Sequence, residues 1–338
     1  MQLRKSRAGW LVAAVATLAL VAAACSSDGG GDSSDGGGGE IVVSGSSTVE
    51  PITSLVAEQF NAENPDVGIS VDGPGTGDGF ELFCNGETDI SDASRPIKDE
   101  EIEACEEAGV EYVELLVGID GLTVLTSPDN DAVECLDIAG IYALVGPEST
   151  GFGSWSDASE LAAALGSAYG DDFPDEDLVI TGPGEESGTY DTFVELTIEE
   201  LAEEQGLADE EIATRPDYTS SPNDNVIVEG IQGSDHSFGW VGYAFFVNNE
   251  DGLAAIAVED EAGECVEPTD ETIATGAYPL SRPLFIYVNT ARAAENPALA
   301  EFVDFYMGDD GLAAVADAGY VQLTPEEWSA TGETWASS

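Results

Sequence analysis

Strands that end in small hydroxyl residues and pass directly into helices constrain this chain more than any other feature. Residues 40–43 are mostly β-branched and predict a short strand, and a helical pattern of apolar residues begins at Pro51. The hydroxyls of Ser46, Ser47 and Thr48 therefore lie where a strand ends and a helix begins. The first amides of a helix have no internal partner and carry the positive end of its dipole, so this junction offers donors to an anion. The alternative is that Ser47 or Thr48 only caps the helix.

Two further loops repeat this arrangement. Residues 178–181 predict a strand, and loop 182–189 leads into a helix that we expect to continue to about residue 204. Residues 73–79 form a Gly-rich loop before another helical pattern. Glycine lets the backbone approach a ligand closely, so the three loops are suited to converge on one small oxyanion. None is followed by Gly-Lys-Ser/Thr, so we do not expect a nucleotide-binding P-loop.

The N-terminal segment has the pattern of a secretory signal. Basic residues precede an apolar run from Trp10 to Ala24, which is shorter than the roughly 20 residues that span a bilayer. The run ends in small residues followed by Cys25, which predicts a signal peptide over residues 1–24 and lipid attachment to Cys25. The alternative is an ordinary cleaved signal followed by an unmodified cysteine. We expect the protein at the extracytoplasmic face of the cell membrane, held there by the lipid.

A short polar linker follows the predicted lipid site. Residues 26–39 are only Ser, Asp and Gly, so they bury no apolar surface. Residues 25–39 are therefore predicted to be the lipidated cysteine and a flexible tether, with a reach of roughly 20 Å. No later run of the sequence approaches the length of a membrane span, so the remainder is expected to be soluble.

Charge in the predicted mature chain is strongly one-sided. Five basic residues follow the signal against 68 acidic residues, a difference of 63 negative charges. Such a surface argues against binding nucleic acid or anionic lipid heads, and its self-repulsion suggests a saline habitat. It also repels a dianion at long range, so a site for one has to bind through local amides, hydroxyls and an arginine. The five basic residues are Arg95, Lys98, Arg215, Arg282 and Arg292.

Four cysteines remain after Cys25. Cys84, Cys105, Cys135 and Cys265 would enter an oxidising compartment, where three pairings are available to them. The alternative is four buried thiols. No close cysteine pairs exist and the only histidine is His236, so we expect neither a metal site nor a cofactor.

Four motifs stand in register: Gly-Ser-Ser-Thr-Val-Glu-Pro (45–51), Gly-Thr-Gly-Asp-Gly-Phe (75–80), the segment 84–96 and Ser-Gly-Thr (187–189). Together they resemble the phosphate-binding lipoproteins that feed bacterial phosphate ABC transporters. Segments 120–124 and 279–284 look like the same family, and the resemblance covers about the whole mature chain. It implies an α/β, two-lobed, type II periplasmic-binding-protein-like fold, with the ligand in a cleft between lobes joined by two crossings. It also implies disulfides Cys84–Cys105 and Cys135–Cys265.

The resemblance also sets expected boundaries and an expected role. Lobe 1 is predicted to comprise residues 40–120 plus 285–338, and lobe 2 residues 121–284. The residue pattern itself, rather than the resemblance, predicts an irregular tail after residue 318. The implied function is binding of inorganic phosphate and its delivery to an ABC permease, by a monomer that is not an enzyme.

The ligand-binding set follows from the matched motifs. Relatives often carry an arginine just upstream of the Ser187 loop, where this chain has Pro183 and Gly184. Arg95 is therefore the main candidate for the cation and Arg282 a weaker one, and the alternative for Arg95 is a pair with a nearby acid. The predicted ligand-binding residues are Ser47, Thr48, Val49, Thr76, Gly77, Ser94, Arg95, Ser187, Gly188 and Thr189.

Discrimination of phosphate from sulfate requires an acceptor for the phosphate proton, which sulfate lacks. Some relatives use an aspartate whose place here looks like Ser94 or Arg95. The candidates in this chain are Asp78 and Asp92, with Glu186 a weaker one.

Three other functions fit parts of the pattern. The same loops would serve another oxyanion such as sulfate or molybdate. A secreted hydrolase with Ser187 as its nucleophile lacks a convincing base, because His236 lies far along the chain and no Gly-x-Ser-x-Gly elbow exists. A phosphate sensor or surface protein would keep the fold without transport.

Overall fold

The computed structural model describes residues 39–170, 173–185, 187–208 and 211–338. The predicted signal peptide (1–24), Cys25, the linker up to residue 38 and Glu186 lie outside the described residues. Within the described ranges, no helix is both long and apolar enough to cross a bilayer.

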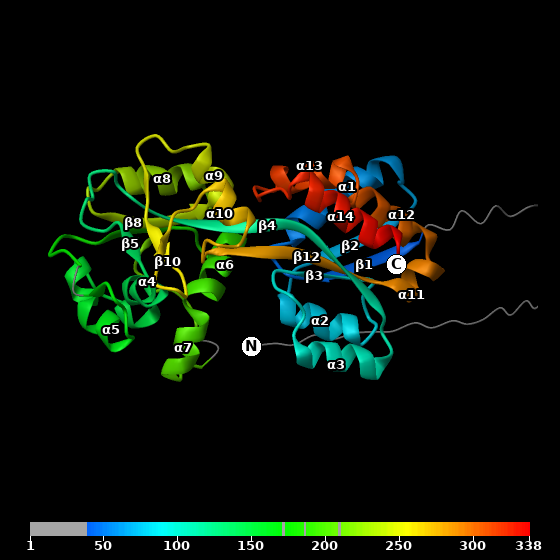
Figure 1. The fold of residues 1–338 in the computed structure, drawn as a ribbon, viewed down its shortest axis with the longest axis horizontal. Coiled ribbons are helices and arrows are strands. Elements are labelled where there is room, and N and C mark those ends of the chain that lie inside the picture. The colour runs from blue at the N-terminus through cyan, green and yellow to red at the C-terminus, as the bar shows by residue number, and fades with distance from the viewer. Residues whose placement is uncertain (1–38, 171–172, 186, 209–210) are drawn as a thin grey trace, which may run out of the picture. The chain divides into compact units, whose positions relative to one another are not determined.

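Two long strands connect two α/β lobes (Figure 1). β4 (Tyr112–Thr126) and β12 (Ser281–Asn289) run antiparallel, paired from Tyr112 with Asn289 to Gly121 with Ser281. β12 also pairs with β3 in the first lobe, whereas β4 continues to pair with β8 in the second. The strand order is therefore β2-β1-β3-β12-β4-β8-β6-β7, with β9 paired to β4.

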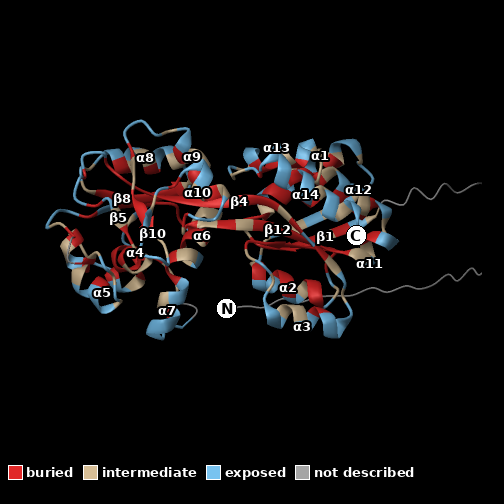
Figure 2. Cartoon of the chain, in the orientation of Figure 1, coloured by how far each residue is buried: buried red, intermediate tan, exposed pale blue. Residues whose placement is uncertain are grey.

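The crossing strand β4 contributes to the apolar cores of both lobes. Val113, Leu115 and Val117 of β4 pack in the core of the first lobe, and Leu122 and Val124 pack in that of the second. Since one continuous strand is buried in both cores, the two lobes meet without an irregular linker. Figure 2 shows these strands buried and the outer faces of the surrounding helices exposed.

In the first lobe, parallel strands β1, β2 and β3 alternate with helices, as expected from the strand–loop–helix pattern. Helices α1, α12, α13 and α14 lie on one side of these strands and α2 and α3 on the other (Figure 1). Its elements are β1 (Glu40–Gly45), α1 (Glu50–Glu63), β2 (Gly68–Asp72), α2 (Thr76–Cys84), β3 (Ile90–Ala93), α3 (Asp99–Ala108), α11 (Thr290–Glu295), α12 (Pro297–Tyr306), α13 (Asp309–Asp317) and α14 (Pro325–Ala336).

The second lobe contains the rest of the large sheet and a small three-stranded sheet of order β11-β10-β5. Phe193 of α6 stacks on Trp240 of β8, with ring centroids 4.1 Å apart and planes inclined by 14°. This stack fixes α6 against the core of the lobe. The elements are β5 (Cys135–Leu136), α4 (Ile138–Val145), η1 (Pro147–Ser149), η2 (Trp155–Ala158), α5 (Ser159–Ala164), β6 (Val179–Gly182), α6 (Gly188–Thr197), α7 (Glu199–Gln205), β7 (Thr219–Ser220), α8 (Asp224–Gln232), β8 (Ser237–Gly242), α9 (Tyr243–Val247), β9 (Ala254–Ala255), β10 (Ala257–Glu259), β11 (Cys265–Val266) and α10 (Asp270–Ala274).

Two disulfides are present, in the pairing that the resemblance implies. Cys84 at the end of α2 bonds to Cys105 of α3, and Cys135 of β5 bonds to Cys265 of β11. The second bridge joins the two outer strands of the three-stranded sheet. These bridges stabilise the fold chiefly by restricting the unfolded chain.

Two expectations for helices are wrong. The segment after residue 318 is not irregular: α14 begins at a capping box between Thr324 and Glu327, and Trp328 is buried. The long helix after Ser187 is also two helices, since α6 ends at Thr197 and α7 begins at Glu199. Val321 pairs with Ile119 of β4, so the C-terminal segment lies along the crossing strand.

Candidate functional site

The loop between β1 and α1 is held by its own backbone. The Ser46 amide donates to the Asp92 carbonyl of β3 at 2.9 Å, and the Val49 amide donates to the Ser46 carbonyl at 3.1 Å. No side chain caps α1. The hydroxyls of Ser47 and Thr48 are therefore not used as helix caps.

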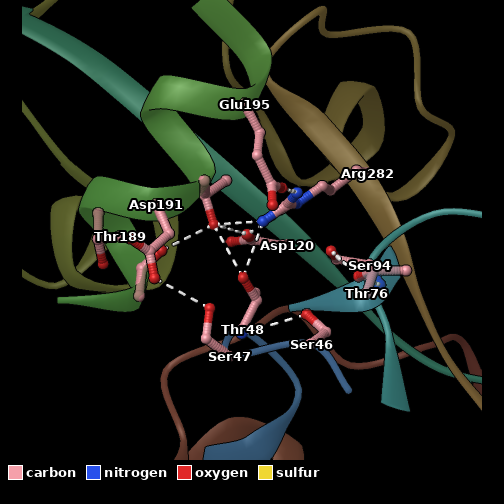
Figure 3. Close-up of polar contacts among 12 residues, drawn as sticks. Ser46, Ser47, Thr48, Thr76, Ser94, Asp120, Thr189, Asp191, Glu195 and Arg282 are labelled. Carbon is pink, nitrogen blue, oxygen red and sulfur yellow. Dashed lines mark hydrogen bonds and ion pairs between the residues drawn. The ribbon is translucent and has the colours of Figure 1, made fainter. Parts of the chain in front are cut away.

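Both hydroxyls instead contact α6 of the other lobe (Figure 3). Ser47 Oγ donates to Asp191 Oδ2 at 2.9 Å. Thr48 Oγ1 lies 3.2 Å from Thr192 Oγ1. The loop between β1 and α1 in the first lobe thus contacts the second lobe through its side-chain hydroxyls.

Arg282 of β12 lies at the centre of these contacts, and its side chain is only 9% exposed. Its Nη2 donates to Thr48 Oγ1 at 2.8 Å and to Thr192 Oγ1 at 2.5 Å. Its Nη1 pairs with the Glu195 carboxylate, and its Nε lies 3.5 Å from Asp120 Oδ2. Arg282 therefore connects a crossing strand, the first loop and α6.

Asp120 is the buried anionic partner in this group. It accepts a 2.9 Å hydrogen bond from Thr192 Oγ1. Burial raises the pKa of Asp120, and the neighbouring Arg282 charge opposes that rise. The positive charge of Arg282 is thus held between the crossing strands by a negative charge on Asp120. Both charges are buried, and each loses the hydration it would have in water.

A pocket of about 590 Å³ adjoins Arg282. Thr76 and Gly77 enter it from the start of α2, and Ser94 and Arg95 from the end of β3. Thr76 Oγ1 lies 3.0 Å from Ser94 Oγ and accepts from the Ser94 amide at 3.2 Å. Four predicted ligand residues therefore line one pocket together with Arg282, the weaker of the two cation candidates from the sequence.

Arg95 itself has a carboxylate partner. Its guanidinium makes a bidentate pair with Glu101, at 2.8 and 2.7 Å, and lies 5.5 Å from the centroid of the Phe80 ring. The hydrogen bonds to Glu101 raise the pKa of Arg95. The sequence left open that Arg95 pairs with a nearby acid, and the structure shows this pair with Glu101. Arg95 nevertheless lines the pocket.

The Ser187-Gly188-Thr189 loop does not line the same pocket. Ser187 Oγ caps α6 by accepting from the Thr189 amide at 3.2 Å. Thr189 lines a different pocket of about 300 Å³, together with Asp120 and Tyr320. Val49 is fully buried in the apolar core, so only its backbone is available for polar contacts.

The two candidate proton acceptors lie in different surroundings. Asp78 lines the pocket beside Gly77. Asp92 lies beneath α1, where Oδ1 accepts from Thr53 Oγ1 at 3.0 Å and Oδ2 has no partner among the described residues. Burial raises the pKa of Asp92 to about 8.

Sequence reasoning missed Asp120 and the α6 residues Asp191, Thr192 and Glu195. The sequence did contain a signal for the α6 residues. They follow the helix start at Ser187, and residues three or four apart in a helix, such as Asp191 and Glu195, lie on the same face. No sequence pattern places Asp120 beside Arg282, because the strand register that brings them opposite appears only in the folded sheet. The described residues contain no cluster of His, Cys, Asp or Glu that would hold a metal ion.

Comparisons with known proteins extend over both lobes. A family model described as a PBP superfamily domain matches residues 30–310. The chain is 38% identical over 286 residues to Protein SphX of Synechocystis sp., covering 84% of this chain and 78% of that protein. It is 34% identical over 287 residues to the phosphate-binding protein PstS of Staphylococcus saprophyticus, covering 84% and 81%. A solved structure of a possible phosphate binding protein from Planctomyces limnophilus is 36% identical with a TM-score of 0.78, covering 88% of this chain and 98% of that one.

Proposed function

We propose, from the premise that this chain belongs to the PBP superfamily, that it binds inorganic phosphate outside the cytoplasm and delivers it to an ABC permease. The single observation that carries the proposal is the pocket in which Thr76, Ser94 and buried Arg282 meet. Hydroxyls, helix-start amides and an arginine are the donors that a phosphate oxygen needs. The phosphate-binding name of a relative at 34% identity supports the same ligand. The role is that of a binding protein rather than an enzyme.

The proposed ligand set keeps the residues predicted from the motifs and adds Arg282. Thr76, Gly77, Ser94 and Arg95 line the pocket already. Ser47, Thr48, the Val49 backbone and the loop Ser187-Gly188-Thr189 would reach phosphate by a hinge movement of the lobes about the two crossing strands. The hinge follows the proposed lobes, residues 40–120 plus 285–338 and residues 121–284.

Asp78 is the better proposed acceptor for the phosphate proton. Its carboxylate lines the pocket, whereas the Asp92 carboxyl contacts Thr53 beneath α1. A carboxylate at the ligand accepts the proton of monohydrogen phosphate and repels sulfate, which has no proton to donate.

The proposal includes the anchor predicted from the sequence. Residues 1–24 would be removed as a signal peptide, and Cys25 would carry lipid. Residues 25–39 would tether a monomeric binding domain close to the permease. The support for this part is the apolar run, the small residues before Cys25 and the linker composition.

Calorimetric titration of residues 40–338 with phosphate and then sulfate, in high salt, tests the function. We expect phosphate to bind with micromolar or tighter affinity and sulfate to give no heat. Sulfate binding without phosphate binding would replace the substrate by another oxyanion. Absence of heat from both anions would contradict the proposed function.

A further inference from the structure

Two carboxylates of α6 contact hydrogen-bond donors that the proposed function gives to phosphate. These donors are the hydroxyl of Ser47 and the guanidinium of Arg282. Asp191 Oδ2 accepts a 2.9 Å hydrogen bond from Ser47 Oγ, and Glu195 pairs with Nη1 of Arg282. The two acids are four residues apart and so lie on one face of the helix. Figure 3 shows both directed from α6 toward the opposing loop and the crossing strand.

We propose that Asp191 and Glu195 are built-in competitors of the ligand and that they set its affinity. This inference rests on the proposed function. Each carboxylate holds a donor that the oxyanion requires, and each must release it before the oxyanion binds there. Asp191 and Glu195 would thus determine affinity without contacting the bound ligand.

The Ser47 contact is exclusive for a chemical reason. A serine hydroxyl has one proton, so it donates either to Asp191 or to an oxygen of the ligand. The Asp191 carboxylate and a phosphate oxygen accept from the same donor in the same way. Occupation by one therefore excludes the other.

Arg282 can change partners because its other contacts remain. Its Nε faces the Asp120 carboxylate, which is only 6% exposed, and its Nη2 donates to Thr48 and Thr192. The Glu195 side chain is 40% exposed and lines the pocket. Glu195 can consequently move into solvent while Asp120 still balances the arginine.

Arg95 provides the contrasting case in the same pocket. Its partner Glu101 is 15% exposed and accepts hydrogen bonds from both Nη1 and Nη2 of Arg95. Glu101 also accepts the Lys98 amide at 2.8 Å, as part of the cap of α3. This pair is anchored to a helix start, so Glu101 lacks the freedom that Glu195 has.

The size of the effect follows from occupancy. If the internal carboxylate holds the donor nine-tenths of the time, the apparent affinity for the ligand falls by about tenfold. Removing the charge of Glu195 should restore that factor.

The test is phosphate titration of the full chain in detergent, for wild type, Glu195→Gln and Asp191→Ala. Glu199→Gln is the matched control, because Glu199 lines the same pocket and no contact joins it to Arg282 or Ser47 among the described residues. We expect Glu195→Gln to bind phosphate about tenfold tighter and Asp191→Ala several-fold tighter, with the control within about twofold of wild type. Thermal unfolding of each variant checks that it is folded.

The outcomes separate this inference from the proposed function. Phosphate binding by all variants with equal affinity, or an equal gain in Glu199→Gln, overturns the competition and leaves the function standing. If neither the wild type nor any variant binds phosphate, the same titrations with sulfate decide between the two ideas. A gain in Glu195→Gln alone would then support the competition for another oxyanion, and no binding of either anion would overturn both ideas.

Discussion

The arginines at the pocket differ in how they are held, and that difference decides what each can do. Arg282 is nearly buried and contacts four polar side chains, whereas Arg95 is 30% exposed and pairs with Glu101. Sequence motifs favoured Arg95 because it follows Ser94 in a matched segment. The register of β12 places Arg282 opposite Asp120, and this pairing makes Arg282 the stronger candidate for the cation.

Arg95→Ala tests whether Arg95 serves the ligand or only Glu101. If its charge reaches the phosphate, removal should weaken binding by more than about tenfold, or about 1.4 kcal/mol. Titration calorimetry measures the change, with Lys98→Ala as a control because Lys98 is an exposed cation lining the same pocket. A loss of less than about twofold would make Arg95 a structural partner of Glu101.

Asp92 should make folding stability depend on pH. Burial raises its pKa from 3.8 to about 8, so between these values the folded state keeps a proton that the unfolded state loses. Protonated Asp92 therefore contributes its full stabilisation below the unfolded-state pKa of 3.8. That contribution is lost as pH rises through the folded-state pKa of about 8. Denaturant unfolding measures this effect. As pH rises from 5 to 9, the free energy of unfolding should fall by a few kcal/mol less in Asp92→Asn than in wild type.

The surface variant Asp66→Asn is the control for Asp92, because it removes one exposed charge and leaves the buried group intact. It should retain the pH dependence of wild type. Parallel pH curves for wild type and Asp92→Asn would show that Asp92 keeps an ordinary pKa.

At the scale of elements, local chemistry predicted the junctions well and the C-terminal region poorly. The β1–α1 and β6–α6 connections follow from β-branched runs that end in Gly, Ser and Thr. The capping box of Thr324 and Glu327 also stood in the sequence, but the largely polar helix after it concealed the signal. The break at Ile198 has no glycine or proline to mark it, so packing rather than local preference determines it.

The disulfides should differ in what they contribute to stability. Cys135–Cys265 closes a separation of 130 residues and Cys84–Cys105 one of 21. The chain-entropy model assigns about 5 kcal/mol to the longer loop and about 3 kcal/mol to the shorter one. Paired Cys→Ala substitutions, compared by denaturant unfolding, should therefore cost more at Cys135 and Cys265. Equal losses would show that local packing outweighs loop length.

For the whole molecule, charge governs the approach of the ligand. The large excess of acidic residues repels a dianion until it comes within the range of the pocket donors. Added salt shortens that repulsion from about 10 Å at 0.1 M to about 3 Å at 1 M. The ionic atmosphere is thus part of the binding equilibrium.

The association rate for phosphate should therefore rise with salt, by several-fold between about 0.1 and 1 M sodium chloride. Rapid filtration with radiolabelled phosphate measures this rate. Sucrose at matched osmolality is the control, since it leaves charge interactions unscreened. A rate that falls as salt is added would mean that the local field at the pocket is positive enough to dominate.

The stacked rings of Phe193 and Trp240 have a practical consequence. Phe193 lies on α6 between Thr192 and Glu195, and its ring covers the indole of Trp240 on the neighbouring strand. Because the ring of Phe193 shields this indole, a shift of α6 against β8 would change the fluorescence emission of Trp240. The protein thus contains an optical probe of its own, able to report movement of α6 within its lobe without an attached dye.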